Sequence, residues 1–417
     1  MPSLQPVRGT QDLLPETTRR HRHIIEIARH IAELYGFAEI ATPIFEFTEV
    51  FARPIGEHTD IVAKEMYTFI DRGGEELTLR PENTAGVVRA ILSNGLAQSG
   101  PLKFFYSGPM FRYERPQKGR FRQFHQIGAE LIGVAQPQAD IEIIALGRRV
   151  LDALAIGDRV TLELNTLGDP ESRAAYRQAL VTYFSHRVTE LSEDSKQRLQ
   201  RNPLRIFDSK EEADRRVVRD APDFADYLNA PSQHFFEQVR LGLDRLDISY
   251  RVNPRLVRGL DYYTHTAFEF VTDDLGAQGA VMGGGRYDGL VELMGGPPLP
   301  GVGWAAGIER LAMLIADPPP SKSPVALVPI GEAAENAALR LAEDLRSRDF
   351  SVDLGYSGNL TRRLRRANRL GAFAAILLGD DELARGTATL RDLNSGSQSE
   401  VPVPELTARL EALAGRS

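Results

Sequence analysis

Cysteine is absent from this chain of 417 residues. That absence excludes disulfide bonds, thiolate zinc sites and cysteine nucleophiles. Long apolar runs are missing too, because no stretch reaches the roughly 18 residues that a membrane-spanning helix needs. The segment from Met1 to Pro15 also lacks an apolar run of signal-peptide length. We therefore expect a cytoplasmic protein.

Basic residues are fewer than acidic ones. The chain has 50 Lys and Arg against 57 Asp and Glu, which gives a net charge of −7. This balance does not by itself favour a nucleic-acid partner, so any such partner must be held by local basic patches. The hydrophobic fraction of 42% and the charged fraction of 26% are ordinary for a globular protein.

Periodicity and composition predict two domains joined by a linker. Residues 1–318 are expected to combine strands with helices, including a helix from Pro15 to about Tyr35 and an extended segment over 37–47. A mostly helical insertion is expected at about 170–245. Residues 319–324 belong to a proline-rich linker. Residues 325–417 alternate strands, at 325–330, 351–356 and 374–378, with helices, at 334–348 and 360–370, as in a small α/β domain.

The segment from Leu102 to Val134 predicts an antiparallel hairpin with a basic loop. Strand alternation places Phe124, Gln126, Gly128 and Glu130 on one face, and His125, Ile127, Ala129 and Leu131 on an apolar core face. A solvated outer face is the usual interpretation of such a polar face. Phe124 argues against it, as do four cations in or near the loop: Arg115, Lys118, Arg120 and Arg122. This pattern favours phosphate binding beside a ring that stacks on a base.

Residues 111–126 resemble motif 2 of class II aminoacyl-tRNA synthetases in its histidyl form. The resemblance implies that Arg112 binds the α-phosphate of ATP and the substrate carboxylate. It also implies that Arg120 reaches the outer phosphates, that Phe124 stacks on adenine and that Glu114 belongs to the same ATP site. Gln117 and Lys118, in the loop, are expected to contact tRNA.

The segment from Thr78 to Thr84 resembles the amino-group pocket of that family. Glu82, Asn83 and Thr84 are the expected contacts, and an ammonium ion, which has donors only, suits a carboxylate and a hydroxyl. Taken alone, the segment is equally compatible with an exposed turn.

Residues 256–265 resemble the histidine-specific motif of histidyl-tRNA synthetases, although an isolated Arg-Gly-Leu-Asp is usually a surface turn. Neutral imidazole has one donor and one acceptor nitrogen. Glu130 can accept from one and Tyr263 can donate to the other, which would reject side chains that leave either group unpaired. The resemblance also assigns Gln126 and Tyr262 to histidine. With Arg112, it makes Arg258 a catalytic cation at the α-phosphate.

Two glycine-rich segments complete the site. Gly283 to Gly289 is interpreted as a tight turn after a strand, without the ending of a P-loop, and the resemblance makes it a wall of the histidine pocket that includes Tyr287. Gly301 to Arg310 resembles motif 3. Arg310 falls in the first turn of a helix, where a cation is unfavourable unless an anion such as ATP lies nearby.

Near the C-terminus, four arginines share one helical stripe: Arg362, Arg365, Arg366 and Arg369. Leu360, Leu364 and Ala367 are expected to face the core. A solvated basic face is the usual alternative, but the domain resembles the family's anticodon-binding domain. This resemblance makes the stripe a tRNA contact whose attraction weakens with salt.

The resemblance runs from Val7 to about residue 400, and the opening helix resembles the dimer-forming motif 1. It implies an α/β fold class, in which the α+β catalytic domain has an antiparallel sheet flanked by helices, the class II synthetase fold. A helical insertion and a C-terminal mixed-sheet α/β anticodon-binding domain complete it. The implied homodimer converts L-histidine and ATP, with Mg²⁺, to histidyl-adenylate and loads the 3′ end of tRNA-His.

A second interpretation is a non-catalytic, histidine-sensing regulatory subunit of ATP phosphoribosyltransferase, which shares the catalytic fold but lacks the anticodon-binding domain in the family pattern. The presence of residues 325–417 and of Arg112, Gln126 and Arg258 favours the enzyme. No protein-held metal site is expected, and His21 and His23 are interpreted as surface residues.

Overall fold

The computed structural model describes residues 4–56, 59, 61–209, 211–256, 262–319 and 322–415. The chain divides into two compact units, Met1–Pro318 and Pro319–Ser417, each with its own hydrophobic core. The boundary falls in the proline-rich segment that ends at Pro324. Among the described helices, none is both long enough and apolar enough to cross a membrane.

An eight-stranded sheet forms the centre of the first unit, in the order β1-β5-β6-β11-β10-β9-β7-β8. Its inner pairs are antiparallel, and only the edge pairs β1–β5 and β7–β8 are parallel. The expected antiparallel sheet and its hairpin are thus confirmed. The strands are β1 (Ala38–Glu39), β5 (Leu102–Phe111), β6 (Gln123–Ile132), β7 (Thr161–Thr166), β8 (Tyr250–Val252), β9 (Thr264–Val271), β10 (Ala280–Arg286) and β11 (Gly301–Gly307).

Helices cover both faces of this sheet. One face packs on a large core with α1 (Pro15–Leu34), α4 (Pro137–Ala153), α8 (Ala230–Arg245) and α10 (Ile308–Leu314). The other packs on α3 (Thr84–Ser93) and α9 (Leu290–Leu293), and α2 (Glu49–Ile55) lies beside these two. In α1 the buried apolar residues Ile24, Ala28 and Ile31 recur at helical spacing, as the sequence predicted.

The first part of the glycine-rich segment, 283–286, continues strand β10, and only 288–289 form a turn, so the prediction of a tight turn from Gly283 was wrong. Gly283, Gly284 and Gly285 lie inside β10, between β9 and β11. A Cβ atom at Gly284 would overlap the carbonyl oxygen of Gly303 on β11 and crowd Trp304. Glycine is therefore needed for close packing across the sheet rather than for a reversal of the chain.

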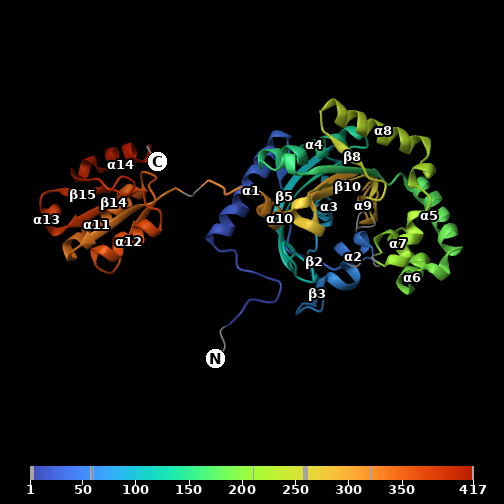
Figure 1. Ribbon diagram of the computed structural model, residues 1–417, viewed down its shortest axis with the longest axis horizontal. Helices are drawn as coiled ribbons and strands as arrows, with labels where there is room; N and C mark the ends of the chain where they lie inside the picture. The colour runs from blue at the N-terminus through green and yellow to red at the C-terminus, as the bar shows by residue number, and fades with distance from the viewer. Residues whose placement is uncertain are drawn as a thin grey trace. The chain divides into compact units, whose positions relative to one another are not determined.

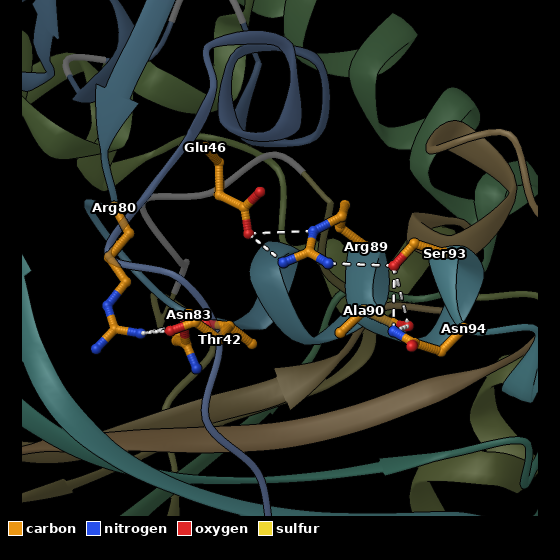
Figure 2. A network of polar contacts seen from close by, with 8 residues as sticks. All are labelled: Thr42, Glu46, Arg80, Asn83, Arg89, Ala90, Ser93 and Asn94. Atoms are coloured by element: carbon orange, nitrogen blue, oxygen red, sulfur yellow. Dashed lines mark hydrogen bonds and ion pairs between the residues drawn. The ribbon is translucent and has the colours of Figure 1, made fainter.

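A separate three-stranded sheet has the order β2-β4-β3. Its strands are β2 (Phe45–Phe47), β4 (Glu76–Leu79) and β3 (Tyr67–Ile70). The expected extended segment over 37–47 is thus two short strands, β1 and β2, with Pro43 between them. The inner face of this sheet is polar: Thr78 exchanges hydrogen bonds with Thr48 and Thr68, and Glu46 accepts from Arg89 of α3 (Figure 2).

The insertion forms a small helical group of its own, seen in green in Figure 1. It contains α5 (Pro170–Ser185), α6 (Glu193–Arg201) and α7 (Glu212–Arg219), around a core that includes Leu180, Phe184 and Ile206. Helix α8 falls in the same stretch of sequence but packs on α4 and β9 of the main body.

The second unit is a five-stranded sheet in the order β13-β12-β14-β15-β16. Its first three strands are parallel and the rest antiparallel, which confirms the expected mixed sheet. The strands are β12 (Val325–Ile330), β13 (Val352–Leu354), β14 (Ala374–Gly379), β15 (Thr387–Asp392) and β16 (Gln398–Pro402). The helices are α11 (Glu332–Arg346), α12 (Leu360–Arg369), α13 (Asp380–Ala384) and α14 (Leu406–Ala414). Leu360 was expected to face the core, but it opens α12 and is 40% exposed.

Candidate functional site

A cavity of about 390 Å³ opens beside the hairpin β5–β6 and strands β9, β10 and β11. Its walls come from segments far apart in the sequence. Ten residues singled out in the sequence line it: Glu82, Thr84, Arg112, Glu114, Arg120, Phe124, Gln126, Tyr262, Tyr263 and Arg310. The side chains on one face of the predicted hairpin therefore line a cavity.

One end of the cavity is rich in guanidinium groups. Arg112 donates to the carbonyl oxygen of Pro81 over 2.8 Å, which fixes its direction. Glu114 Oε2 lies 2.8 Å from Arg120 Nε and Glu114 Oε1 3.9 Å from Arg112 Nη1. Burial lowers the pKa of Arg310, and the charges of Arg120 and Arg112 lower it further. Three cations thus share this region, which favours an anionic ligand.

The same end offers a flat contact surface. Phe124 lies beneath the Arg112 guanidinium, 5.3 Å from the ring centroid to Cζ. Beside β6, the neighbouring strand β11 lines the cavity with Gly303, Ala305 and Gly307. Because these residues have small or no side chains, a planar ligand can approach the backbone closely.

The other end carries buried hydrogen-bonding groups. The Glu82 carboxylate accepts from the backbone N–H groups of Thr84, at 2.6 Å, and Ala85, at 2.9 Å, at the start of α3. Burial raises the pKa of Glu82 in spite of these bonds. In the described part of the chain, Gln126 Oε1 and the Tyr262 hydroxyl are buried without a hydrogen-bond partner. Buried polar atoms are nearly always paired, so these two indicate a polar ligand.

Glu130 lies just behind this end, with three hydroxyl groups around its carboxylate. Oε1 accepts from Thr84 at 2.7 Å and from Tyr106 at 3.3 Å, and Oε2 accepts from Tyr287 at 2.5 Å. Burial raises the pKa of Glu130 to about 8. A side chain at Gly303, which lines the cavity, would overlap Glu130 Oε2, so this glycine leaves the carboxylate next to the cavity.

Some predicted contacts lie elsewhere. Asn83 turns away from the cavity: its Oδ1 accepts from Thr42 at 2.6 Å and Arg80 at 3.2 Å (Figure 2). Tyr287 reaches Glu130 rather than the cavity wall. The segment from Thr78 to Thr84 is not an exposed turn, because Glu82, Asn83 and Thr84 are at most 8% exposed. Arg258 lies outside the described residues.

The residues expected to contact tRNA are exposed. Gln117 and Lys118 lie in the hairpin loop. In the second unit Arg362, Arg365 and Arg369 project from α12, and Arg366 is tied to Asp353 by two bonds of 3.0 and 2.8 Å.

Several residues escaped the sequence reasoning. Tyr106 lies behind the cavity wall, where it binds Glu130, and Glu269 lies in the wall. Each is a strand residue that belongs to none of the sequence motifs. Glu309 lines the cavity and also binds His125. His21 is not a surface residue, because it is only 5% exposed beside His125. Its place in the apolar repeat of α1 was the one available signal.

Comparison with known proteins gives a consistent result. The family "Histidyl-tRNA synthetase" matches residues 9–311, and "Anticodon binding domain" matches residues 324–413. The chain is 61% identical over 402 residues to the histidine–tRNA ligase of Rhodospirillum rubrum, covering 96% of this chain and 97% of that one. It is 59% identical over 415 residues to the histidine–tRNA ligase of Gluconacetobacter diazotrophicus, covering 100% of each.

Solved structures agree. The apo histidyl-tRNA synthetase of S. aureus is similar with a TM-score of 0.83 at 35% identity, covering 98% of this chain and 99% of that one. An ATP phosphoribosyltransferase regulatory subunit/histidyl-tRNA synthetase from Bacillus halodurans C has a TM-score of 0.66 at 21% identity, covering 91% and 99%. The second likeness shows a shared fold alone.

The raised pKa of Glu130 predicts a pH-dependent stability. A carboxyl whose pKa is about 8 in the folded chain, against 4.5 as its ordinary value, stabilises the fold fully below pH 4.5. That contribution is lost as pH rises through about 8. Glu130→Gln stays neutral, so its unfolding free energy should fall less over this range, by a difference on the order of 5 kcal/mol.

Urea unfolding at several pH values measures this difference. The fluorescence of Trp304, the single tryptophan, reports the first unit alone. Glu82, whose pKa is also raised by burial, contributes the same pH dependence to wild type and to Glu130→Gln, so its effect cancels in the difference. Parallel stability curves for wild type and Glu130→Gln would contradict the assignment.

Proposed function

The chain belongs to the histidyl-tRNA synthetase family and is a histidine–tRNA ligase, and from this premise we propose how its cavity activates histidine. The carboxylate of L-histidine attacks the α-phosphate of ATP, which gives histidyl-adenylate and releases pyrophosphate. The 3′ end of tRNA-His then takes the histidyl group and AMP leaves. The observation that carries this proposal is the meeting of a cationic end and a buried polar end in one cavity.

The cationic end receives ATP. Arg112 binds the α-phosphate and the histidine carboxylate, which places the two reacting groups together. Arg120 and Arg310 bind the outer phosphates, and this relieves the repulsion that lowers the pKa of Arg310. Phe124 stacks on adenine, on the far side of the Arg112 contact.

Magnesium would arrive with ATP and neutralise its outer phosphates. Glu114 and Glu269, the carboxylates near Arg310 in the cavity wall, supply the hard oxygen donors that this ion prefers. These two carboxylates would help to hold the ion beside the outer phosphates, where it would neutralise negative charge.

The polar end receives histidine. Glu82, Thr84 and Gln126 accept from the α-ammonium group, which has donors only. The imidazole lies over Gly303, between Glu130 and Tyr263, and Tyr262 closes the pocket. Asn83 and Tyr287 act through other residues: Asn83 orients the start of α3, and Tyr287 holds Glu130. Arg258, beyond the described residues, stays a predicted catalytic cation.

This reaction asks little covalent chemistry of the protein. Alignment of the two reactants and neutralisation of developing charge at the α-phosphate supply most of the acceleration. The cavity is suited to both, since its cations are fixed by bonds such as that from Arg112 to Pro81.

The second unit reads the anticodon region of tRNA-His. Arg362, Arg365 and Arg369 form an exposed cationic stripe on α12, and single-stranded loop bases are what proteins recognise in RNA. Arg366 is paired with Asp353, so we assign it to shaping the domain as well as to phosphate. Gln117 and Lys118 approach the acceptor end from the hairpin loop.

A second copy of the chain covers the three-stranded sheet. Its inner face is polar, as Glu46 and Thr78 show, and its outer face is apolar. Cross-strand neighbours Phe47, Leu77 and Phe69 share that outer face, where Phe47 is 56% and Phe69 43% exposed. An apolar patch of this kind on a soluble chain marks an interface. A homodimer would cover the apolar outer face and leave the polar inner face packed within each copy. We place this dimer in the cytoplasm, where tRNA is charged.

The regulatory-subunit interpretation is not favoured. The relatives that match 96% and 100% of the chain, at 61% and 59% identity, are histidine–tRNA ligases, and residues 324–413 match an anticodon-binding domain. The likeness to the Bacillus halodurans protein extends to the fold only.

Exchange of pyrophosphate into ATP tests the proposed activation. We expect exchange that requires L-histidine, and a loss of roughly 10²–10³-fold in kcat/KM for Arg112→Ala, which removes one charge from the α-phosphate. Arg216→Ala, an exposed arginine on α7, is the matched control and should keep the wild-type rate. Exchange without histidine, or an unaffected Arg112→Ala enzyme, would refute the proposal. Absent exchange together with histidine sensitivity conferred on a phosphoribosyltransferase would instead support the regulator.

The salt dependence of tRNA binding tests the α12 stripe. Replacing Arg362, Arg365 and Arg369 by alanine should lower the slope of log affinity against log salt by about 2, because each phosphate contact on single-stranded RNA contributes roughly 0.7. Alanine at Arg340, Arg346 and Arg348, in or just after α11, changes the net charge equally and should leave the slope unchanged. Equal slopes for the two triple variants would rule out the stripe.

Light scattering tests the dimer. Wild type should have the mass of two chains, and Phe47→Glu should have the mass of one, because it places a charge in the apolar interface. Leu339→Glu alters a residue in the second unit that is equally exposed, at 57% against 56%, and should stay dimeric. A Phe47→Glu protein that remains dimeric at micromolar concentration would mean that the sheet is not the interface.

A further inference from the structure

His21, His125 and Glu309 form a cluster beside the cavity, whose wall Glu309 also lines. They come from α1, β6 and α10, which pack on one another. One ligand atom from each lies within 4.8 Å of the other two. The Glu309 carboxylate lies 2.8 Å from His125 Nδ1 and accepts from the His125 backbone N–H over 3.0 Å. The His21 ring lies edge-on to that of His125 at 5.5 Å.

This cluster is not an ordinary surface group. His21 is 5% and Glu309 7% exposed. Among the described residues, no lysine or arginine forms an ion pair with Glu309, and the His21 ring makes no hydrogen bond. In the described part of the chain the Glu309 carboxylate is bonded by His125 alone, so a cation held beside His21 would complete the neutralisation of this buried charge.

The His21 ring is available as a ligand. One of its ring nitrogens lies within 4.8 Å of the ligand atoms of His125 and Glu309, and a neutral imidazole has a lone pair on one nitrogen, which is the form that binds metals.

We propose that His21, His125 and Glu309 bind one divalent transition-metal ion of the zinc type, with water in the fourth position. Two imidazoles and a carboxylate are a donor set that zinc accepts, at bond lengths of about 2.0–2.2 Å. Two tetrahedral ligands of such an ion lie roughly 3.3 Å apart, so the pair His125–Glu309 is already close to the required spacing. His21 closes the remaining distance by side-chain rotation.

The cluster is accessible to an ion from solvent, and a bound ion would link parts of the ATP site. The His125 side chain is 22% exposed, so an ion and its water can reach the cluster from solvent. The bound ion would join α1 to β6 and α10. His125 lies between Phe124 and Gln126, and Glu309 precedes Arg310, so the ion would fasten both elements that carry ATP-site residues.

The test uses the full-length chain, freed of metal by chelator and dialysis, and titrated with Zn²⁺. Wild type should bind one ion per chain. His21→Phe, which keeps an aromatic ring but no ligand, should weaken binding at least tenfold, while His30→Phe, an exposed histidine on the same helix, should not. At a Zn²⁺ concentration about 100 times Kd, the melting temperature of the first unit should rise by roughly 5 °C in wild type and His30→Phe only.

Co²⁺ provides a second measurement that does not depend on any variant folding. Bound to wild type in the proposed site, it should show the intense visible band of a four-coordinate ion, in place of the weak band of the aqueous ion. Equal Zn²⁺ affinity in His21→Phe and His30→Phe would overturn the site. So would a wild-type Co²⁺ spectrum that stays that of the aqueous ion, whether or not His21→Phe folds.

Discussion

A single buried carboxylate, that of Glu130, constrains the architecture around the histidine pocket. An isolated charge in this environment would be costly, and burial raises its pKa to about 8. Hydroxyl groups from Thr84, Tyr106 and Tyr287 surround it. These donors belong to α3, to β5 and to the segment after β10. Hydrogen bonding of this one carboxylate therefore requires three distant parts of the chain to be correctly positioned around it.

The cationic end poses the opposite problem. Arg112, Arg120 and Arg310 are crowded together, and their repulsion, added to burial, lowers the pKa of Arg310. Such an arrangement does little for the stability of the unliganded chain, but it is preorganised for a polyanion. The cavity thus combines a neutral or negative end, fitted to an ammonium and an imidazole, with a positive end fitted to phosphates.

Helix α3 links the pocket to the proposed dimer interface. Its first turn carries Thr84, which binds Glu130, and it also carries Arg89, which binds Glu46 of β2 (Figure 2). Because Glu46 points inward, its neighbours Phe45 and Phe47 point outward from the same strand. The polar contacts that hold α3 in place therefore also present the apolar face that a second copy covers.

The amino-acid sequence by itself determined what depends on near neighbours in the chain: the helix of α1, the hairpin β5–β6 and the face of it that carries Phe124, Gln126 and Glu130. Motif resemblance added the residues that converge on the cavity. Only the tertiary structure decided how deep each residue lies. Gly284 lies in a strand in close contact with Gly303 and Trp304 of the neighbouring strand. Asn83 accepts a hydrogen bond from Arg80, and the His21 ring is buried against that of His125. Strands β15 and β16 were likewise not predicted, and they depend on pairing: β15 pairs with β14, and β16 pairs with β15. Burial and strand pairing depend on which distant segments pack together, and the local periodicity of the sequence does not determine that.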